Sequence, residues 1–236
     1  MANEVIKTAD KIKKWRKLGN RLRLSILILL LFLIILYLVL KVMFSDSNFV
    51  VSLKSNDSLE SGLAIYESLY DRTPKRILKA KNLQFMDNIS EKWLPEDIDA
   101  EYDGSHNGEN YIAYTFYVEN QSKSIFDYWY SIIVEDVIKN VDEAVRIKIF
   151  LNGEDTTYAK GSSIDDSPEP GTTKFRNDED GTIILEERPD LNPGDIDRIT
   201  IVVWIEGNDP ECIDALIGGE ILMHMDITEE HVRKKK

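Results

Sequence analysis

Beyond residue 44, apolar and polar side chains alternate along much of the chain, which is the period-two pattern of half-buried β-strands. In the stretch 144–160, for example, Val145 and Ile147 alternate with Arg146 and Lys148. No long amphipathic helical pattern separates such stretches, so neighbouring strands are expected to pair antiparallel. Further stretches that alternate, or that are rich in β-branched and aromatic residues, are 49–54, 110–120, 125–137, 181–187, 196–206 and 219–227.

This pattern predicts a mainly β fold, with an antiparallel β-sandwich of the jelly-roll-like or Ig-like kind over residues 45–232. A two-sheet sandwich is the simplest way to bury one face of each strand. The pair Asn152-Gly153 predicts a hairpin turn within 144–160, because both residues tolerate a positive φ.

The stretch 209–218, "DPECIDALIG", predicts one short crossover helix between two strands. Asp209 suits an N-cap, Pro210 suits the first helical position and Gly218 suits the position after the helix end. The side chains expected to pack this helix against an edge of the sandwich are Ile213, Leu216 and Ile217.

Residues 24–40, "LSILILLLFLIILYLVL", carry no charge and would be apolar on every side of a helix. Extending the run to Phe44 gives roughly the 20 residues that a bilayer-crossing helix needs. We therefore predict a transmembrane signal anchor over 24–44, in contact with membrane lipid. The basic segment 1–23 precedes this anchor, which predicts a cytoplasmic N-terminus and an extracellular domain on a single-pass protein of the cell membrane.

A cleaved signal peptide is the alternative to an anchor. Such a peptide has an apolar core of about 7–15 residues followed by small residues at the cleavage site. The apolar run here is longer, and Ser45-Asp46-Ser47 is a poor cleavage site. The sequence of residues 1–22 indicates either a short amphipathic helix that lies on anionic lipid or a basic tail that only sets the membrane topology. Residues 233–236 form a second basic tail.

The net charge of −13 is divided unevenly along the chain. Residues 1–23 carry eight basic residues against two acids, a net charge of +6, and Lys41 adds one more, so the rest of the chain carries −20. A body this acidic repels phosphates, which argues against a nucleic-acid partner. The stretch 71–81, "DRTPKRILKAK", is a local basic patch that faces either lipid headgroups near the anchor or solvent.

Motifs of known catalytic centres such as HExxH, GxSxG and the Walker loop are absent from the sequence. The stretch "DGSHNGEN" begins as a calcium-binding loop does, because Asp103, Ser105 and Asn107 place oxygen ligands two residues apart before Gly108. The twelfth position, where such loops carry a bidentate Glu, is Tyr114. These three residues are therefore a calcium candidate, with an ordinary loop as the alternative.

Cys212 is the only cysteine of the chain, so no intramolecular disulfide can form. A helix N-terminus lowers the pKa of a thiol, but Asp209, Glu211 and Asp214 bring negative charge to this one and no His is near in sequence. We therefore predict no catalytic residue, no enzyme activity and, apart from calcium, no cofactor.

Four phrases, "NISEKWLP", "HNGENYIAYTFYVEN", "VIKNVDEAVRIKIFLNG" and "VVWIEGNDPECIDALIGGEI", resemble those of uncharacterised membrane-anchored surface proteins of Gram-positive, Clostridia-like bacteria. The resemblance covers most of residues 80–230 and implies a location at the cell surface, without an activity. The overall plan is distantly similar to the TasA/camelysin class of β-sandwich surface proteins, some of which build extracellular fibres. The metallopeptidase activity described for camelysin-type members has no zinc-peptidase motif to rest on here.

Together these features predict a non-enzymatic cell-surface protein whose acidic sandwich makes structural or adhesive interactions. Its partners would be other surface proteins, or second copies that associate by strand addition with residues 49–54 as the donor strand. Three alternatives remain: a calcium-dependent extracellular binding module, a secreted fibre or matrix subunit released by cleavage, and a hydrolase whose paired carboxylates meet only in the fold.

Overall fold

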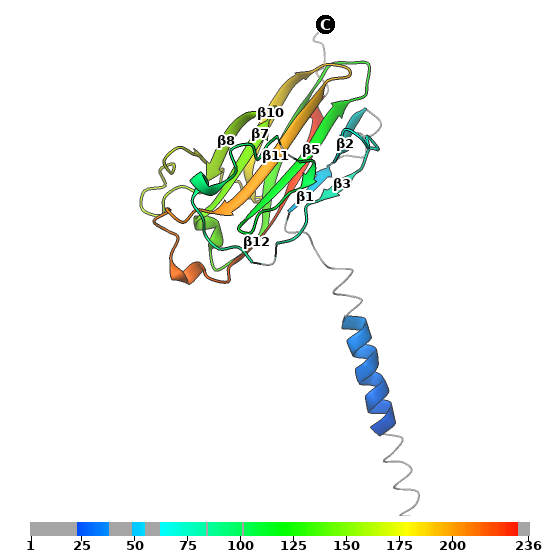
Figure 1. The fold of residues 1–236 in the computed structure, drawn as a ribbon, viewed down its shortest axis with the longest axis vertical. Helices are drawn as coiled ribbons and strands as arrows, with labels where there is room; N and C mark the ends of the chain where they lie inside the picture. Colours follow the sequence, from blue (N-terminus) through cyan, green and yellow to red (C-terminus); the bar gives the residue numbers. More distant parts are fainter. Residues whose placement is uncertain (1–22, 38–48, 55–61, 84, 101, 231–236) are drawn as a thin grey trace, which may run out of the picture. The chain divides into compact units, whose positions relative to one another are not determined.

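The chain divides into two compact units, Met1–Asp46 and Ser47–Lys236, in the computed structural model of the protein (Figure 1). The residues whose structure is described are 23–37, 49–54, 62–83, 85–100 and 102–230.

In the first unit, residues 23–37 form an α-helix, and every one of these residues is exposed. Within the described residues, no helix combines the length and the apolar character that crossing a membrane requires. The predicted anchor over 24–44 extends outside the described residues, as do the basic tail 233–236 and all of the predicted segment 1–23 except Arg23. The anchor therefore stays a prediction.

The second unit is built of two β-sheets, which confirms the predicted mainly β, sandwich-like fold. The first sheet has the strand order β10-β6-β12-β1-β3, and the second has the order β2-β5-β11-β7-β8-β9 with β4 paired to β5. Figure 1 shows β5, β11, β7 and β8 side by side in the second sheet. The strands are β1 (Phe49–Leu53), β2 (Leu63–Tyr66), β3 (Ile77–Lys79), β4 (Gly104–Ser105), β5 (Tyr111–Asn120), β6 (Phe126–Ile138), β7 (Val145–Leu151), β8 (Glu154–Ala159), β9 (Thr173–Lys174), β10 (Thr182–Leu191), β11 (Ile196–Ile205) and β12 (Glu220–Glu230).

The main hydrophobic core lies between the two sheets and is made by the inward positions of the alternating pattern. Ile147 of β7 and Ile132 of β6 are both fully buried in it. Burying such a side chain stabilises the fold by about 1.5–3 kcal/mol. A polar contact also joins the sheets, because the Tyr128 hydroxyl of β6 donates a 2.8 Å hydrogen bond to Asp197 Oδ2 of β11.

Each of the predicted strand stretches contains a strand, and the Asn152-Gly153 turn has the positive φ angles expected, 54° and 90°. The expectation of antiparallel pairing holds for most strand pairs but not for all. β1 pairs parallel with β12 and antiparallel with β3, and β8 pairs parallel with β9. The proposed donor strand, 49–54, is thus hydrogen-bonded on both sides within its own sheet.

The predicted crossover helix over 209–218 is wrong. The segment forms turns and then the short 3-10 helix η3 (Asp214–Leu216). The Asp209 carboxylate pairs with Arg146, and Ile213 and Ile217 are 58% and 66% exposed instead of packed against the sandwich. The remaining 3-10 helices of the described chain are η1 (Glu91–Trp93) and η2 (Val141–Glu143).

A second, smaller core lies on the outer face of the second sheet. Trp204 of β11 is fully buried there, beneath Ile89 and Ile98 from the segment between β3 and β4. This segment is joined to the end of β11, because the Ile89 N–H donates to the Ile205 carbonyl and the Gly207 N–H donates to the Ile89 carbonyl, both at 2.9 Å. The cover so formed fixes the start of the loop that follows β11.

Candidate functional site

The three calcium-candidate residues lie on or beside β4, and their side chains bond to neighbouring segments. Asp103 Oδ1 accepts a 2.6 Å hydrogen bond from the Tyr117 hydroxyl. Ser105 Oγ accepts a 2.7 Å bond from the backbone N–H of Lys81, and Asn107 Nδ2 donates a 2.9 Å bond to the Lys81 carbonyl. Ser105 and Asn107 thus hold the backbone of Lys81, as the alternative of an ordinary loop implies, and the three residues stay a calcium candidate.

An open pocket of about 450 Å³ lies beside these residues. His106 is half-buried at its wall, with Nδ1 3.0 Å from the Gly104 carbonyl oxygen and Nε2 2.9 Å from the Ile98 carbonyl oxygen. Because both ring nitrogens face carbonyl groups of the protein, His106 holds the loop together. The pocket is lined by Pro95, Ile98, Tyr102, Asp103, Ser105, His106, Asn107 and Tyr111.

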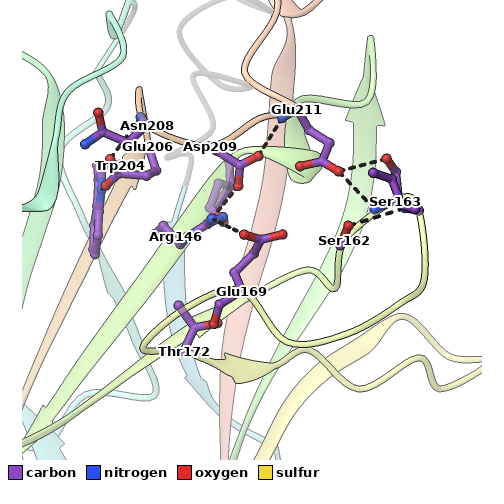
Figure 2. Close-up of polar contacts among 12 residues, drawn as sticks. Arg146, Ser162, Ser163, Glu169, Thr172, Trp204, Glu206, Asn208, Asp209 and Glu211 are labelled. Atoms are coloured by element: carbon purple, nitrogen blue, oxygen red, sulfur yellow. Dashed lines mark hydrogen bonds and ion pairs between the residues drawn. The ribbon is translucent and has the colours of Figure 1, made fainter.

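A cluster of charged side chains surrounds Arg146 on the outer face of β7 (Figure 2). Arg146 lies opposite Trp204 in the register of β7 and β11, and it is only 4% exposed. Its guanidinium forms an ion pair with Asp209, whose side chain is fully buried, and Glu169 Oε2 lies 4.0 Å from the same nitrogen. A guanidinium is stable at such depth only when it is paired, because desolvating a charge costs several kcal/mol.

Glu211 completes this group, which we call the Arg146 cluster (Arg146, Glu169, Asp209 and Glu211). Figure 2 shows Glu211 bonded to Ser163, whose backbone N–H and hydroxyl donate to Glu211 Oε1 at 3.0 and 2.7 Å. One carboxylate oxygen from each acid lies within 4.8 Å of the other two. The cluster therefore ties the loop after β8 to the loop after β11, both over β7.

The three carboxylates of the cluster differ in the direction of their pKa shifts. Burial raises the pKa of Asp209. Burial, followed by the negative charge of Asp209, raises the pKa of Glu169. Hydrogen bonds from Asp209 and from Ser163 lower the pKa of Glu211 to about 2. Glu211 is thus the acid that stays ionised, whereas Asp209 and Glu169 bind protons first as the pH falls.

The chemistry open to the Arg146 cluster is the binding of positive charge, because three carboxylates lie close together and two of them face the Arg146 guanidinium. Carboxylate oxygens are the ligands that hard cations prefer. The Arg146 guanidinium is already the positive group that pairs with the buried Asp209. The main role of the cluster is therefore structural: it holds the loops after β8 and β11 on the second sheet.

The local sequence pattern missed this cluster. It assigned Asp209 and Glu211 to the start of a helix, and Glu169 lies in a polar loop far from them in sequence. The side chain of Lys148, two residues after Arg146 on the same strand face, is 16% exposed. Its ion-pair partners Glu91 and Asp155 are each 48% exposed. No signal in the alternating pattern distinguishes the buried Arg146 from this neighbour.

The remainder of the loop after β11 is also explained by packing. Glu206 accepts hydrogen bonds from Trp204 Nε1 at 3.0 Å and from the backbone N–H groups of Glu91 at 3.0 Å and Asn208 at 3.1 Å. Cys212 is half-buried, and its Sγ accepts a 3.2 Å hydrogen bond from Asn88 Nδ2. The cysteine follows a turn, not the first turn of a helix, so the dipole argument for a reactive thiol does not apply to it.

No protein-family model and no curated protein matches the chain. Among solved structures, it is similar to the β-glucosidase from Kluyveromyces marxianus in complex with glucose, with 15% sequence identity and a TM-score of 0.23 over 74% of this chain. A second structure of that β-glucosidase gives 12% identity and a TM-score of 0.25 over 69% of this chain. The chain spans 18% and 16% of the length of these enzyme chains, and similarity this low carries no statement about activity.

Proposed function

We propose that the protein is a non-enzymatic, single-pass membrane-anchored surface protein whose acidic sandwich, of the jelly-roll-like or Ig-like kind, makes structural or adhesive interactions. The observation that carries this proposal is the exposed apolar surface of the helix at residues 23–37. Large apolar side chains along it, such as Leu27 (63%), Ile28 (60%) and Phe32 (59%), are exposed to well over a third. A helix that is apolar all round requires lipid or other protein around it.

The flanking sequence favours lipid as that surrounding medium. The uncharged run continues to Leu40, and the basic segment 1–23 precedes it. Positive charge before an uncleaved apolar run retains the N-terminus in the cytoplasm. Residues from about 45 onward would then lie outside the cell as the acidic sandwich.

The polar groups of the sandwich favour binding over catalysis. Nucleophilic or acid–base catalysis needs a nucleophile, a base and a reacting atom within hydrogen-bond reach of one another. In the described part of the chain, Cys212, His106 and the Arg146 cluster each have partners that hold loops together.

Strand addition remains part of this proposal, at a different place from the donor strand 49–54 that the sequence suggests. Because β1 is already paired with β12 and β3, it must leave its own sheet before it can be donated. The outer strand β10 of that sheet is the position at which a partner strand adds in this proposal.

The anchor is tested by fractionating cells that express the full chain with a C-terminal tag. We expect the protein to stay in membranes washed with alkaline carbonate, its mature N-terminus to lie at Met1 or Ala2, and its sandwich to be cleaved by protease added to intact cells. A charge near a helix centre opposes insertion, so Leu30→Arg should lower the fraction of the protein that stays in the membranes.

The matched control is Ile164→Arg, because Ile164 is 90% exposed on a loop of the sandwich. This variant should remain in the membrane fraction like the natural protein. Soluble protein with a mature terminus near Asn48 would refute the anchor and favour the secreted fibre or matrix subunit.

A further inference from the structure

We propose that residues 69–81, here called the basic edge, dock onto the anionic lipid headgroups of the membrane that holds the anchor. The basic edge consists of most of the loop that follows β2, of β3, and of the two residues after β3. The inference rests on the proposed function, because the anchor brings the edge to the membrane.

The basic edge has a charge opposite to that of the body to which it belongs. Five basic residues stand against Asp71 within 71–81, in a body that otherwise carries strong negative charge. Ion pairs join Arg72 to Glu119 at 3.8 Å and Lys75 to Glu67 at 2.9 Å. The five basic residues, all exposed, are Arg72, Lys75, Arg76, Lys79 and Lys81.

Lys79 and Lys81 differ from the other basic residues of the edge. Within the described part of the chain, neither of them forms an ion pair, although the protein is rich in carboxylates. Their ammonium groups are therefore available to an external anion. An anionic membrane surface attracts such groups strongly within a Debye length, which is about 8 Å at physiological salt.

Exposed apolar side chains accompany these charges. Tyr70 is 98% exposed, Ile77 is 55% exposed and Leu69 is 43% exposed. Basic side chains mixed with aromatic and aliphatic ones are typical of surfaces that lie in the headgroup region of a bilayer. The combination suits a lipid surface better than a purely ionic partner.

Within the second unit, the backbone places the edge beside the start of β1. The Ala80 N–H donates a 3.1 Å hydrogen bond to the carbonyl of Phe49, the first residue of β1, so Lys79 and Lys81 flank that point. Phe44, the last residue of the predicted anchor, precedes Phe49 by five residues, which span at most about 18 Å when fully extended. The anchor thus limits how far the basic edge can lie from the headgroups.

Burial of Leu78 and hydrogen bonds with neighbouring residues also fix the conformation of the basic edge. Ile77 and Lys79 are exposed on one face of β3, whereas Leu78 between them is 2% exposed. The backbone of Lys81 is held by Ser105 and Asn107, two of the residues that resemble a calcium loop. Lysines also protect edge strands from unwanted pairing, but that role does not account for Tyr70 and the basic residues outside β3.

The test uses the full chain reconstituted in vesicles of phosphatidylcholine alone or of equal parts phosphatidylcholine and phosphatidylglycerol. In a Cys212→Ser chain, Ile77→Cys carries a fluorophore, and a headgroup-attached quencher reports its contact with lipid. A label on Ile164→Cys, in the loop after β8, is the control for an exposed site outside the basic edge. Vesicle flotation measures anchoring separately.

We expect strong quenching of the residue 77 label on anionic vesicles, weak quenching on neutral ones, and weak quenching of the residue 164 label on both. Salt at about 1 M, where the Debye length is about 3 Å, should reduce the contact. Lys79→Glu with Lys81→Glu should lower the docking equilibrium by at least about fivefold for each lysine, because each change removes an attraction and adds a repulsion. The same reversal at the exposed Lys92 and Lys123 should leave it unchanged.

Three results would overturn the docking. The first is a floating chain whose residue 77 label is not quenched, or is quenched equally on neutral vesicles. The second is a response of that label to a soluble anionic polymer and not to vesicles, which would assign the edge to a polymer. The third is a chain that does not float at all, which refutes the anchor and the docking together.

Discussion

The Arg146 cluster and the basic edge both concentrate charge, but their surroundings are opposite. In the cluster, the side chains of Arg146 and Asp209 are 5% and 0% exposed, and each is the partner of the other. At the edge, Lys79 and Lys81 are exposed and have no ion-pair partner among the described residues. Buried charge is committed to holding loops, whereas exposed and unpaired charge is free for a partner. Pairing and depth, not the amount of charge, separate the structural region from the interaction region.

The largest expected effect comes from breaking the buried pair. Asp209→Ala leaves the Arg146 guanidinium buried with only the more distant Glu169, so we expect the free energy of unfolding to fall by about 3–5 kcal/mol. Urea unfolding of the full chain measures this change. The control Asp136→Ala removes an exposed acid of β6 and should change stability by no more than about 0.5 kcal/mol. Equal effects of the two variants would mean that the cluster is not structural.

A smaller effect with a defined pH dependence is expected at Glu206. Burial raises its pKa, but hydrogen bonds from Trp204, Asn208 and Glu91 outweigh this and lower the pKa below 4.5. A carboxylate with a lowered pKa stabilises the fold above its unfolded pKa, and this contribution is lost as the pH falls through its folded pKa. Glu206→Gln should therefore cost about 1 kcal/mol at neutral pH, with part of the bond energy screened by solvent.

The measurement compares urea midpoints at about pH 6 and about pH 3. Below pH 4.5 the natural chain should lose the Glu206 contribution, so the difference between it and Glu206→Gln should narrow. A difference that is constant over this pH range would show that the carboxylate charge is not what holds the loop.

At the basic edge we expect almost no change in stability. Lys79→Glu with Lys81→Glu alters exposed side chains without ion-pair partners in the described chain, so its urea midpoint should stay within about 0.5 kcal/mol of that of the natural protein. The same variant should lose contact with anionic vesicles. A large loss of stability would place these lysines with the structural charges and remove the contrast between the two regions.

The smallest expected effect is that of calcium. Asp103, Ser105 and Asn107 already bond to neighbouring protein groups, so we expect millimolar calcium to leave the melting temperature unchanged. A rise in melting temperature that Asp103→Asn abolishes would instead establish the calcium loop. A rise that Glu211→Gln abolishes would place a cation in the Arg146 cluster.

Part of the fold was predictable because its signals are local. Alternation located the long strands, and Asn152-Gly153 marked a turn whose φ angles are positive as expected. Four short strands span four residues or fewer, which is too short to show an alternating apolar and polar pattern. They are β2, β3, β4 and β9. The helix expected over 209–218 does not form: Asp209 accepts the Glu211 N–H and also pairs with Arg146 from a distant strand, and the segment makes turns before η3.

By itself, the sequence determined the class of each long segment and the uneven distribution of charge, since both depend on neighbouring residues. The uncharged run at 24–40, the basic residues before it and the acidic body after it are readable without a fold. Only the tertiary structure decided what each charged residue does. It placed β1 between β12 and β3, and it brought Asp209 to Arg146 and Ser105 to the backbone of Lys81. Those contacts join residues far apart in the chain, and no local pattern specifies which distant groups will meet.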